Sequence, residues 1–248
     1  MVRRLNNLDV SIMSTPPSLS AHKTTVIDLK AGHLTLGTAA ASVNILKGID
    51  LQIRAGETVG VLGPSGAGKT SLLMVIAGLE NLTNGQISLA GSDITKMDED
   101  RLAAIRRDMV GIVFQAFRLI PSLTALQNVA IPLELAGRID ATDEAAAALK
   151  SVGLGHRLTH LPDQMSGGEQ QRVAIARAVA PNPRILLADE PTGNLDSATG
   201  EKVVNILFKS AHDTGAALVL VTHDATLAKR CSRVLEIEDG IIVGDTKQ

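Results

Sequence analysis

Aromatic residues are scarce in this sequence, which contains three Phe and neither Tyr nor Trp among its 248 residues. Its single cysteine, Cys231, cannot form an internal disulfide, and such a count is typical of a reducing compartment. We interpret Cys231 as a small buried or half-exposed residue without chemistry of its own. No apolar run approaches the roughly 20 residues that a membrane-spanning helix needs, and the N-terminal Met-Val-Arg-Arg is not followed by an apolar signal segment. These absences predict a cytoplasmic protein.

An excess of one charge is also missing, since 24 Lys and Arg stand against 26 Asp and Glu, for a net charge of −2. A nucleic-acid partner usually shows as a basic excess or a clustered basic stripe, so none is expected here. Hydrophobic residues make up 45% of the chain, the ordinary share for a globular protein. The chain is long enough to bury a sizeable core.

Short apolar runs alternate with helical patterns over most of the chain. We expect buried strands at 58–62, 110–114, 184–188 and 217–221. We expect helices at about 69–77, 98–107, 166–180 and 197–213. This alternation is typical of an α/β fold whose mostly parallel sheet is covered on both faces, and such sheets bind ligands at the carboxyl ends of their strands.

Three regions depart from this alternation. Residues 26–36 and 44–53 alternate loosely between apolar and polar, which predicts an N-terminal antiparallel β subdomain. Residues 118–165 carry helical patterns and three prolines, which indicates an inserted helical subdomain. Residues 1–24 lack periodicity and are expected to be a disordered extension to one folded domain over 25–248.

A glycine-rich loop, Gly63-Pro-Ser-Gly-Ala-Gly-Lys-Thr70, follows the expected strand 58–62 and fits the phosphate-loop pattern G-x-x-x-x-G-K-[ST]. Its glycines let backbone N–H groups point at phosphate oxygens, and the next helix presents its positive N-terminus to the same anion. We expect Lys69 to reach the β- and γ-phosphates and the Thr70 hydroxyl to bind Mg²⁺. The predicted nucleotide-binding residues are Gly63, Pro64, Ser65, Gly66, Ala67, Gly68, Lys69, Thr70 and Ser71.

Two adjacent carboxylates, Asp189 and Glu190, end the expected strand 184–188. A buried carboxylate is costly without a partner, so such a pair is a poor packing feature. Next to bound Mg·ATP each has a role. Asp189 would hold the magnesium, usually through water, and Glu190 would polarise the attacking water as general base.

Two more polar residues end neighbouring strands. His223 follows the strand at 217–221 and can reach a γ-phosphate and position the water. Gln115 follows the strand at 110–114 and is placed to contact Mg²⁺ or the water. The predicted catalytic residues are therefore Glu190, His223 and Lys69, and the predicted metal ligands are Thr70, Gln115 and Asp189.

A second anion site is indicated by Met165-Ser-Gly-Gly-Glu-Gln-Gln-Arg172, where two glycines open a helix. Such a start leaves free N–H groups and a serine hydroxyl at the helix N-terminus. The chain has one phosphate loop, so a second phosphate-binding site is explained if two chains share two nucleotides. The residues of this predicted site are Ser166, Gly167, Gly168 and Glu169.

Together with the turn Asn194-Leu-Asp196, these motifs resemble the nucleotide-binding subunits of ATP-binding-cassette (ABC) transporters over about residues 25–245. The resemblance implies a P-loop NTPase with a RecA-like core, which hydrolyses ATP with Mg²⁺. It implies an ATP-bound homodimer in which Ser166 and Gly168 of one subunit clamp the γ-phosphate held by Lys69 of the other. Asp196 would communicate between the sites.

The same resemblance implies an integral-membrane permease as partner and a location on the inner face of the cell membrane. Gln115 and the helices after it would contact that permease. The apolar residues that follow it are either a groove for a permease helix or ordinary core of the helical subdomain; they are Phe117, Leu119, Ile120 and Leu123.

Within this family, several sequence segments are most similar to one subgroup. Among them are Gly111-Ile-Val-Phe-Gln-Ala-Phe117 and Ala188-Asp-Glu-Pro-Thr-Gly-Asn-Leu-Asp196. It includes the lipoprotein-release ATPase, the macrolide and lipoprotein exporter and the cell-division ATPase. In that subgroup the permease has few spans and a large extracytoplasmic domain, which dimer closure is thought to move. The subgroup implies export or extraction of a lipoprotein or another hydrophobic substrate.

Two departures from the wider family stand out. Glu169 occupies a position where Gln is usual. The aromatic residue that stacks on adenine before the phosphate loop is missing, since the position near Leu36 is apolar and the first Phe is Phe114. This substitution predicts weaker ATP affinity or looser base selectivity, at a cost of about 1 kcal/mol.

Three other functional interpretations have to be weighed against that of a transporter subunit. A cassette protein of translation or DNA repair usually carries two cassettes or a long coiled-coil insertion, and neither is present. A kinase or GTPase lacks the second Gly-Gly helix start, and no Asn-Lys-x-Asp base-recognition motif occurs. A regulatory, non-hydrolysing ATP binder would not need the intact set of Lys69, Glu190 and His223.

Overall fold

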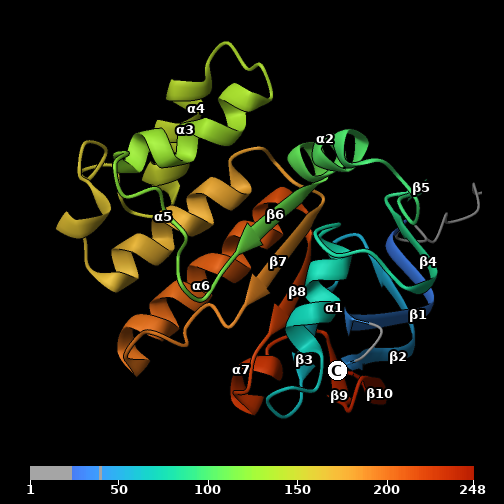
Figure 1. Cartoon of the computed structure of the whole chain (residues 1–248). Helices are drawn as coiled ribbons and strands as arrows, with labels where there is room; N and C mark the ends of the chain where they lie inside the picture. Colours follow the sequence, from blue (N-terminus) through green and yellow to red (C-terminus); the bar gives the residue numbers. More distant parts are fainter. Residues whose placement is uncertain (1–23, 39–40) are drawn as a thin grey trace, which may run out of the picture.

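The computed structural model describes residues 24–38 and 41–248. The predicted disordered extension lies outside the described residues except for Thr24. Two sheets and seven α-helices make up the described part of the chain (Figure 1). None of these helices is both long and apolar enough to cross a membrane.

The central sheet has six strands in the order β10-β9-β3-β8-β7-β6. Their bounds are β3 Thr58–Leu62, β6 Val110–Val113, β7 Ile185–Asp189, β8 Ala217–Val221, β9 Arg233–Glu238 and β10 Ile241–Lys247. All neighbouring pairs are parallel except the β9–β10 hairpin. The short apolar runs form the inner strands because both faces of such a strand are covered. The predicted α/β fold with a mostly parallel sheet is confirmed.

Alternate residues of the central strands face opposite sides of the sheet, because side chains alternate along a strand. In β7, Ile185 and Leu187 pack with α1 (Lys69–Ile76) and the second sheet, whereas Leu186 and Ala188 pack with the opposite layer. That layer holds α5 (Gly167–Val179) and α6 (Ser197–Thr214). The helices on the two faces are separated by the sheet in Figure 1.

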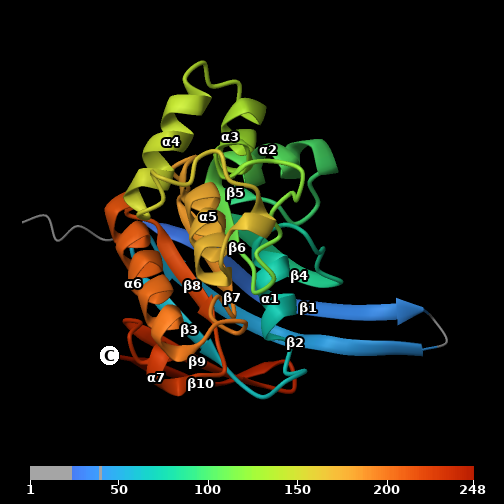
Figure 2. The same cartoon turned by 90° about the vertical axis from the view of Figure 1, so that its left-hand side faces the viewer.

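The second sheet is antiparallel, in the order β2-β1-β4-β5. Its strands are β1 Thr25–Thr38, β2 Ala41–Arg54, β4 Asn84–Leu89 and β5 Ser92–Asp93. β1 and β2 form the long ribbon that extends away from the core in Figure 2. The predicted N-terminal antiparallel β subdomain is therefore present, and its buried face covers α1.

Helices α3 (Ala125–Leu135) and α4 (Ala141–Ser151) lie at one end of the molecule, in the segment for which a helical insertion is predicted (Figure 2). α3 begins at a capping box formed by Thr124 and Gln127. The buried side chain of Asn128 donates to the backbone carbonyls of Ile120, Leu123 and Thr124 at 3.0–3.1 Å. These bonds fix the loop that leads from the central sheet into α3.

Three remaining short elements complete the chain: α2 Glu99–Met109, the 3₁₀ turn Pro162–Gln164 and α7 Ala225–Ala228. Cys231 follows α7 and is buried, as expected. Burial raises the pKa of its thiol to about 12. The side chain is therefore a packing residue that stays protonated at neutral pH.

Candidate active site

The carboxyl ends of three adjacent parallel strands form the floor of the site. Residue pairing places Val61 of β3 beside Val221 of β8, and Val221 beside Asp189 of β7. The segments that follow these strands therefore start from one edge of the sheet. This is the edge at which open α/β sheets bind ligands.

The loop after β3 requires its glycines. Gly63, Gly66 and Gly68 all have positive φ, at 154°, 81° and 98°. A Cβ at Gly63 would lie 2.1 Å from the carbonyl oxygen of Ile237, so no side chain fits there. Gly68 precedes α1 without any side-chain capping bond, which leaves the first N–H groups of α1 available to an anion.

A cavity of about 450 Å³ lies over this loop. Its lining is Ile45, Gly63, Pro64, Ser65, Gly66, Gly68, Lys69, Thr70, Ser71, Glu190 and His223. The structure thus brings together all predicted phosphate-loop residues except Ala67, which is buried beneath the loop. The Nζ atom of Lys69 donates to the carbonyl oxygens of Gly63 and Pro64 at 2.8 Å. This places an ammonium group across the mouth of the loop.

Thr70 and Asp189 meet beside the cavity. The Oγ1 atom of Thr70 donates to the two carboxylate oxygens of Asp189, at 3.2 Å each. Burial raises the pKa of Asp189, and the hydrogen bond from Thr70 opposes that rise. A hydroxyl and a carboxylate at this separation are the hard oxygen ligands that Mg²⁺ prefers, so these two residues fit the predicted metal site.

Glu190 and His223 form a pair on the far wall of the cavity. Glu190 has a φ of +43°, which is unusual for a residue with a side chain and costs on the order of 1 kcal/mol. Its N–H donates to the Val221 carbonyl at 2.9 Å, so the turn is held by β8. A carboxylate oxygen of Glu190 lies 3.1 Å from Nδ1 of His223. The strained turn aims this carboxylate at the phosphate loop instead of continuing the strand.

Gln115 does not join this cavity. Its side-chain nitrogen lies 3.5 Å from the amide oxygen of Asn194, and Asn194 donates back to the Gln115 carbonyl at 3.0 Å. A Cβ on Gly193 would lie 2.5 Å from the same Gln115 nitrogen. Gln115 therefore packs on the turn 192–196, and the predicted contact with Mg²⁺ stays a prediction.

The predicted second anion site lies at the start of α5. Ser166 caps the helix: its hydroxyl accepts from the N–H of Glu169 at 3.3 Å, and its own N–H donates to the Glu169 carboxylate at 2.9 Å. A Cβ on Gly168 would lie 2.3 Å from the Thr199 methyl group, so this glycine permits the approach of α6. Ser166, Gly168 and Glu169 line a separate cavity of about 650 Å³.

Asp196 lines a further cavity, of about 500 Å³, together with His223. It caps α6, where its side chain accepts from the N–H of Thr199 at 3.0 Å. The hydrogen bonds of Thr199 lower the pKa of Asp196, so this carboxylate is charged at neutral pH. Within the described residues, no side chain lines both the phosphate-loop cavity and the cavity at α5. The two predicted phosphate sites of one chain thus lie in separate cavities.

Sequence reasoning missed two residues that hold the site together. Gln171 is fully buried in α5 and donates to the carbonyls of Pro191 at 2.8 Å and Phe114 at 3.3 Å. A polar residue on the inward face of α5 was a signal that could have found it. Arg157 pairs with Glu169 at 2.9 Å, and no local pattern marks that pairing.

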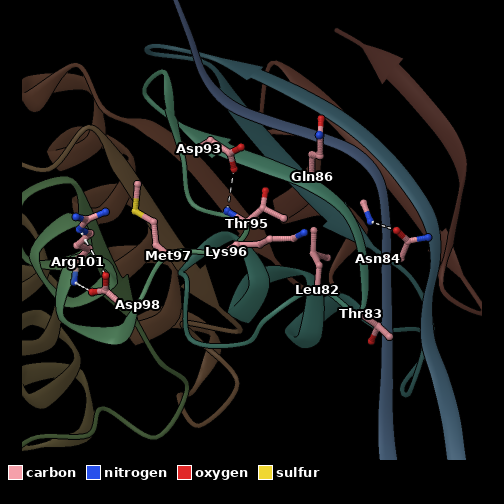
Figure 3. A pocket seen from close by; sticks show the side chains of 11 residues that line it. Leu82, Thr83, Asn84, Gln86, Asp93, Thr95, Lys96, Met97, Asp98 and Arg101 are labelled. Atoms are coloured by element: carbon pink, nitrogen blue, oxygen red, sulfur yellow. Dashed lines mark hydrogen bonds and ion pairs between the residues drawn. The ribbon is translucent and has the colours of Figure 1, made fainter.

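A larger cavity, of about 790 Å³, lies elsewhere, between β4, β5 and the start of α2 (Figure 3). Its labelled side chains include Lys96, Asp98 and Arg101, and the Asp93 carboxylate bonds the Thr95 N–H at 2.9 Å. It contains none of the predicted site residues. The site is therefore identified by its chemistry and not by size.

Comparison with known proteins gives a consistent result. Residues 46–193 match the family model described as "ABC transporter". The chain is 47% identical over 208 residues to the uncharacterized ABC transporter ATP-binding protein YbbA of Escherichia coli K12, covering 83% of this chain and 91% of YbbA. It is 47% identical over 217 residues to the lipoprotein-releasing system ATP-binding protein LolD 2 of Caulobacter vibrioides, covering 87% and 95%.

A solved structure is similar as well. The dimeric ATP-binding cassette MJ0796, in a post-hydrolysis state bound to ADP and phosphate, superposes with a TM-score of 0.82 at 41% identity. The alignment covers 89% of this chain and 98% of that one.

Proposed function

Since this chain belongs to the ABC transporter family and is an ATP-hydrolysing cassette of the LolD type, we propose that two copies close on ATP and thereby drive a membrane permease. The observation that carries the proposal is the convergence of Lys69, Asp189, Glu190 and His223 on one phosphate loop. The segments that bring them there are far apart in sequence and adjacent in the sheet. This arrangement matches the needs of phosphoryl transfer, which depends on positioning and charge stabilisation.

In the proposed reaction, the phosphate loop and the start of α1 bind the triphosphate, with Lys69 released from its two carbonyl partners to the β- and γ-phosphates. The Glu190 carboxylate accepts a proton from water as that water attacks the γ-phosphorus, and ADP leaves. His223, held by Glu190 at 3.1 Å, orients the same water. Thr70 and Asp189 would hold Mg²⁺, which would supply positive charge to offset that of the triphosphate.

The half-site at α5 supports the dimer part of the proposal. Ser166 and Gly168 lie at a helix N-terminus that faces a cavity without any phosphate-loop residue. A second chain that presents its own bound nucleotide would complete this cavity. Because the relation is symmetric, two chains would enclose two nucleotides. MJ0796, similar in sequence and fold, is a dimer.

The proposal that this chain drives a permease rests on its similarity to LolD 2, which is named as the ATP-binding protein of a lipoprotein-releasing system. We place the proposed contact at the loop after Gln115, where Ile120 is 42% exposed while Leu119 packs against the core. The exposure of Ile120 supports a contact role for that residue, and the packing of Leu119 supports a core role for it. A hydrophobic or lipid-modified substrate and a location at the inner face of the membrane follow from the same similarity.

The decisive experiment uses Glu190→Gln, which removes the base and keeps the side-chain shape. With Mg·ATP it is expected to turn over at least about 100-fold more slowly than wild type and to form a stable dimer by size-exclusion chromatography. Equal turnover by the two proteins would remove Glu190 from the mechanism. A monomer with bound ATP would overturn the shared-site proposal.

The trapped Glu190→Gln dimer is also bait for the partner. Pull-down from native membranes with Mg·ATP, and with ADP as the matched control, is expected to recover a permease with few spans and a large extracytoplasmic domain. Recovery of ribosomal or repair proteins in its place would contradict the transporter role and leave the ATPase chemistry intact.

A further inference from the structure

The start of α5 combines two features that oppose each other. A helix N-terminus attracts anions because its first N–H groups are free. Here that N-terminus already carries an acidic residue, Glu169, whose carboxylate accepts from the N–H of Ser166 at 2.9 Å and from its hydroxyl at 3.0 Å. A partner's triphosphate arriving at Ser166 would meet this negative charge within a few ångströms.

Arg157 compensates the negative charge of Glu169. Its Nε donates to the second carboxylate oxygen of Glu169 at 2.9 Å, and the Glu169 side chain is only 14% exposed. Among the described residues this is the one ion pair that Glu169 makes. A charge-assisted hydrogen bond at this distance and degree of burial is stronger than a surface pair. Arg157 therefore neutralises Glu169 and fixes the rotamer in which it caps the helix.

Arg157 is itself held in place by its surroundings. Its Nη1 lies 2.9 Å from Nε2 of His160, and since a guanidinium only donates, that imidazole nitrogen accepts. The segment is anchored to the first turn of α3, because Ala125 donates to the His160 carbonyl at 2.8 Å and Leu126 to the Leu158 carbonyl at 3.0 Å. A continuous set of bonds thus joins the start of α3 to Ser166.

We propose that Arg157 is a positioning residue for ATP hydrolysis: by holding and neutralising Glu169, it lets an acidic residue cap the helix that receives the partner subunit's γ-phosphate. The inference rests on the proposed sharing of nucleotides between two chains. The inference assigns a role to Arg157, which lies outside the recognised sequence motifs. It also explains why the acidic residue Glu169 is tolerated beside Ser166. It also makes a charge-specific prediction, because the harm of losing Arg157 comes from the carboxylate that it leaves behind.

The test is a four-member set with Arg157→Ala, Glu169→Gln, the double variant and wild type, assayed for ATP hydrolysis at one protein concentration. Glu169→Gln keeps a side-chain oxygen for the Ser166 N–H and removes the charge. Arg157→Ala is expected to raise KM for ATP about tenfold, with a smaller change in kcat. Adding Glu169→Gln to it is expected to return KM most of the way to wild type.

The controls separate positioning from folding. Arg138→Ala removes the exposed Arg138–Glu144 pair in the same helical region and is expected to leave KM unchanged. Arg157→Lys, which keeps the charge, is expected to stay near wild type, and Arg157→Gln replaces the alanine variant if that protein does not fold. ADP titration of Arg157→Ala is expected to match wild type, because the phosphate-loop cavity contains neither Arg157 nor Glu169.

An unchanged KM in Arg157→Ala, or a raised KM that Glu169→Gln fails to restore, would overturn the inference. Glu190→Gln is run in the same series. If wild type hydrolyses ATP and Glu190→Gln dimerises, such a result removes the role of Arg157 alone. If neither happens, the shared-site proposal itself has failed.

Discussion

The helices α1 and α5 each offer an N-terminus to phosphate, and the two are built differently. α1 follows Gly68 in a left-handed conformation, with no side-chain cap and no acidic residue in its first turn. α5 follows Ser166 with a full capping box and Glu169 in its first turn. The N–H groups of α1 are therefore free for a ligand, whereas part of those of α5 are satisfied within the chain.

In the proposed dimer, this difference would assign nucleotide binding to α1 and closure of the dimer to α5. All residues that line the phosphate-loop cavity come from one chain, so one subunit would bind nucleotide without its partner. The α5 half-site is stable without phosphate because Ser166 and Glu169 satisfy one another. In the proposed dimer the partner's phosphate would compete with these internal hydrogen bonds, so we expect this contact to be the weaker and more easily reversed of the two. Such an arrangement suits a dimer that opens after each hydrolysis.

The largest effect is expected from a substitution at the start of α1. Lys69→Ala removes the ammonium that lies across the loop mouth, so both nucleotide binding and turnover should fall, with kcat lower by about 100-fold or more. ADP titration and a phosphate-release assay measure the two effects. Binding that stays at the wild-type level would show that the α1 N-terminus suffices without the lysine.

A smaller and different loss is expected at α5. Ser166→Ala should cost about 1 kcal/mol of unfolding free energy through the missing cap and lower turnover about tenfold through the missing phosphate contact. Nucleotide binding to the subunit's own phosphate loop should not change. Denaturant unfolding, the phosphate-release assay and ADP titration check these three outcomes. Weakened ADP binding in this variant would contradict the separation of the half-sites.

A third prediction concerns the part of the phosphate-loop site that would contact the nucleotide base. Leu36 and Val43 are cross-strand partners on the β1–β2 ribbon, 39% and 61% exposed, and Ile45 farther along β2 lines the nucleotide cavity. If these aliphatic side chains face the base, Leu36→Tyr should tighten ATP binding about fivefold, equivalent to about 1 kcal/mol. Wild type should then discriminate weakly between ATP and GTP. Tight, ATP-selective binding by wild type would refute this account.

The smallest expected effect concerns pH. The Ser166 N–H, followed by the Ser166 hydroxyl and Arg157, lowers the pKa of Glu169 below its ordinary value of 4.5. The ionised group therefore favours folding, fully so above the unfolded-state pKa, and this contribution is lost as pH falls through the folded-state pKa. Unfolding free energies of wild type and Glu169→Gln should differ at pH 7 and converge toward pH 3. A constant difference over that range would mean that the charge of Glu169 does not stabilise α5.

Much of the fold and of the first half-site could be read from local sequence. Buried strands such as 58–62 and 217–221 are apolar on both faces, and the loop before Lys69 needs glycine at positions of positive φ. Both signals lie within a few consecutive residues. The α/β class and the phosphate loop were therefore predictable.

Three site features depended on contacts between distant segments. Gln115 was expected near the metal because it ends a strand, but its side chain packs on the turn at Asn194. Gln171 bonds to carbonyls on two other segments. The pairing of Arg157 with Glu169 spans the 3₁₀ turn between them. Periodicity describes which face a residue occupies and says nothing about such partners.

The sequence by itself determined the alternation of buried strands and helices along the chain, the glycine-dependent phosphate loop and the placing of Glu190 at a strand end, because each follows from backbone sterics or burial over short stretches. Only the tertiary structure decided that Glu190 turns through a strained φ toward His223 and that the α5 half-site lies in a cavity of its own. It also decided that Arg157 meets Glu169. These are distances between separate elements, and they are set when the sheet and helices pack.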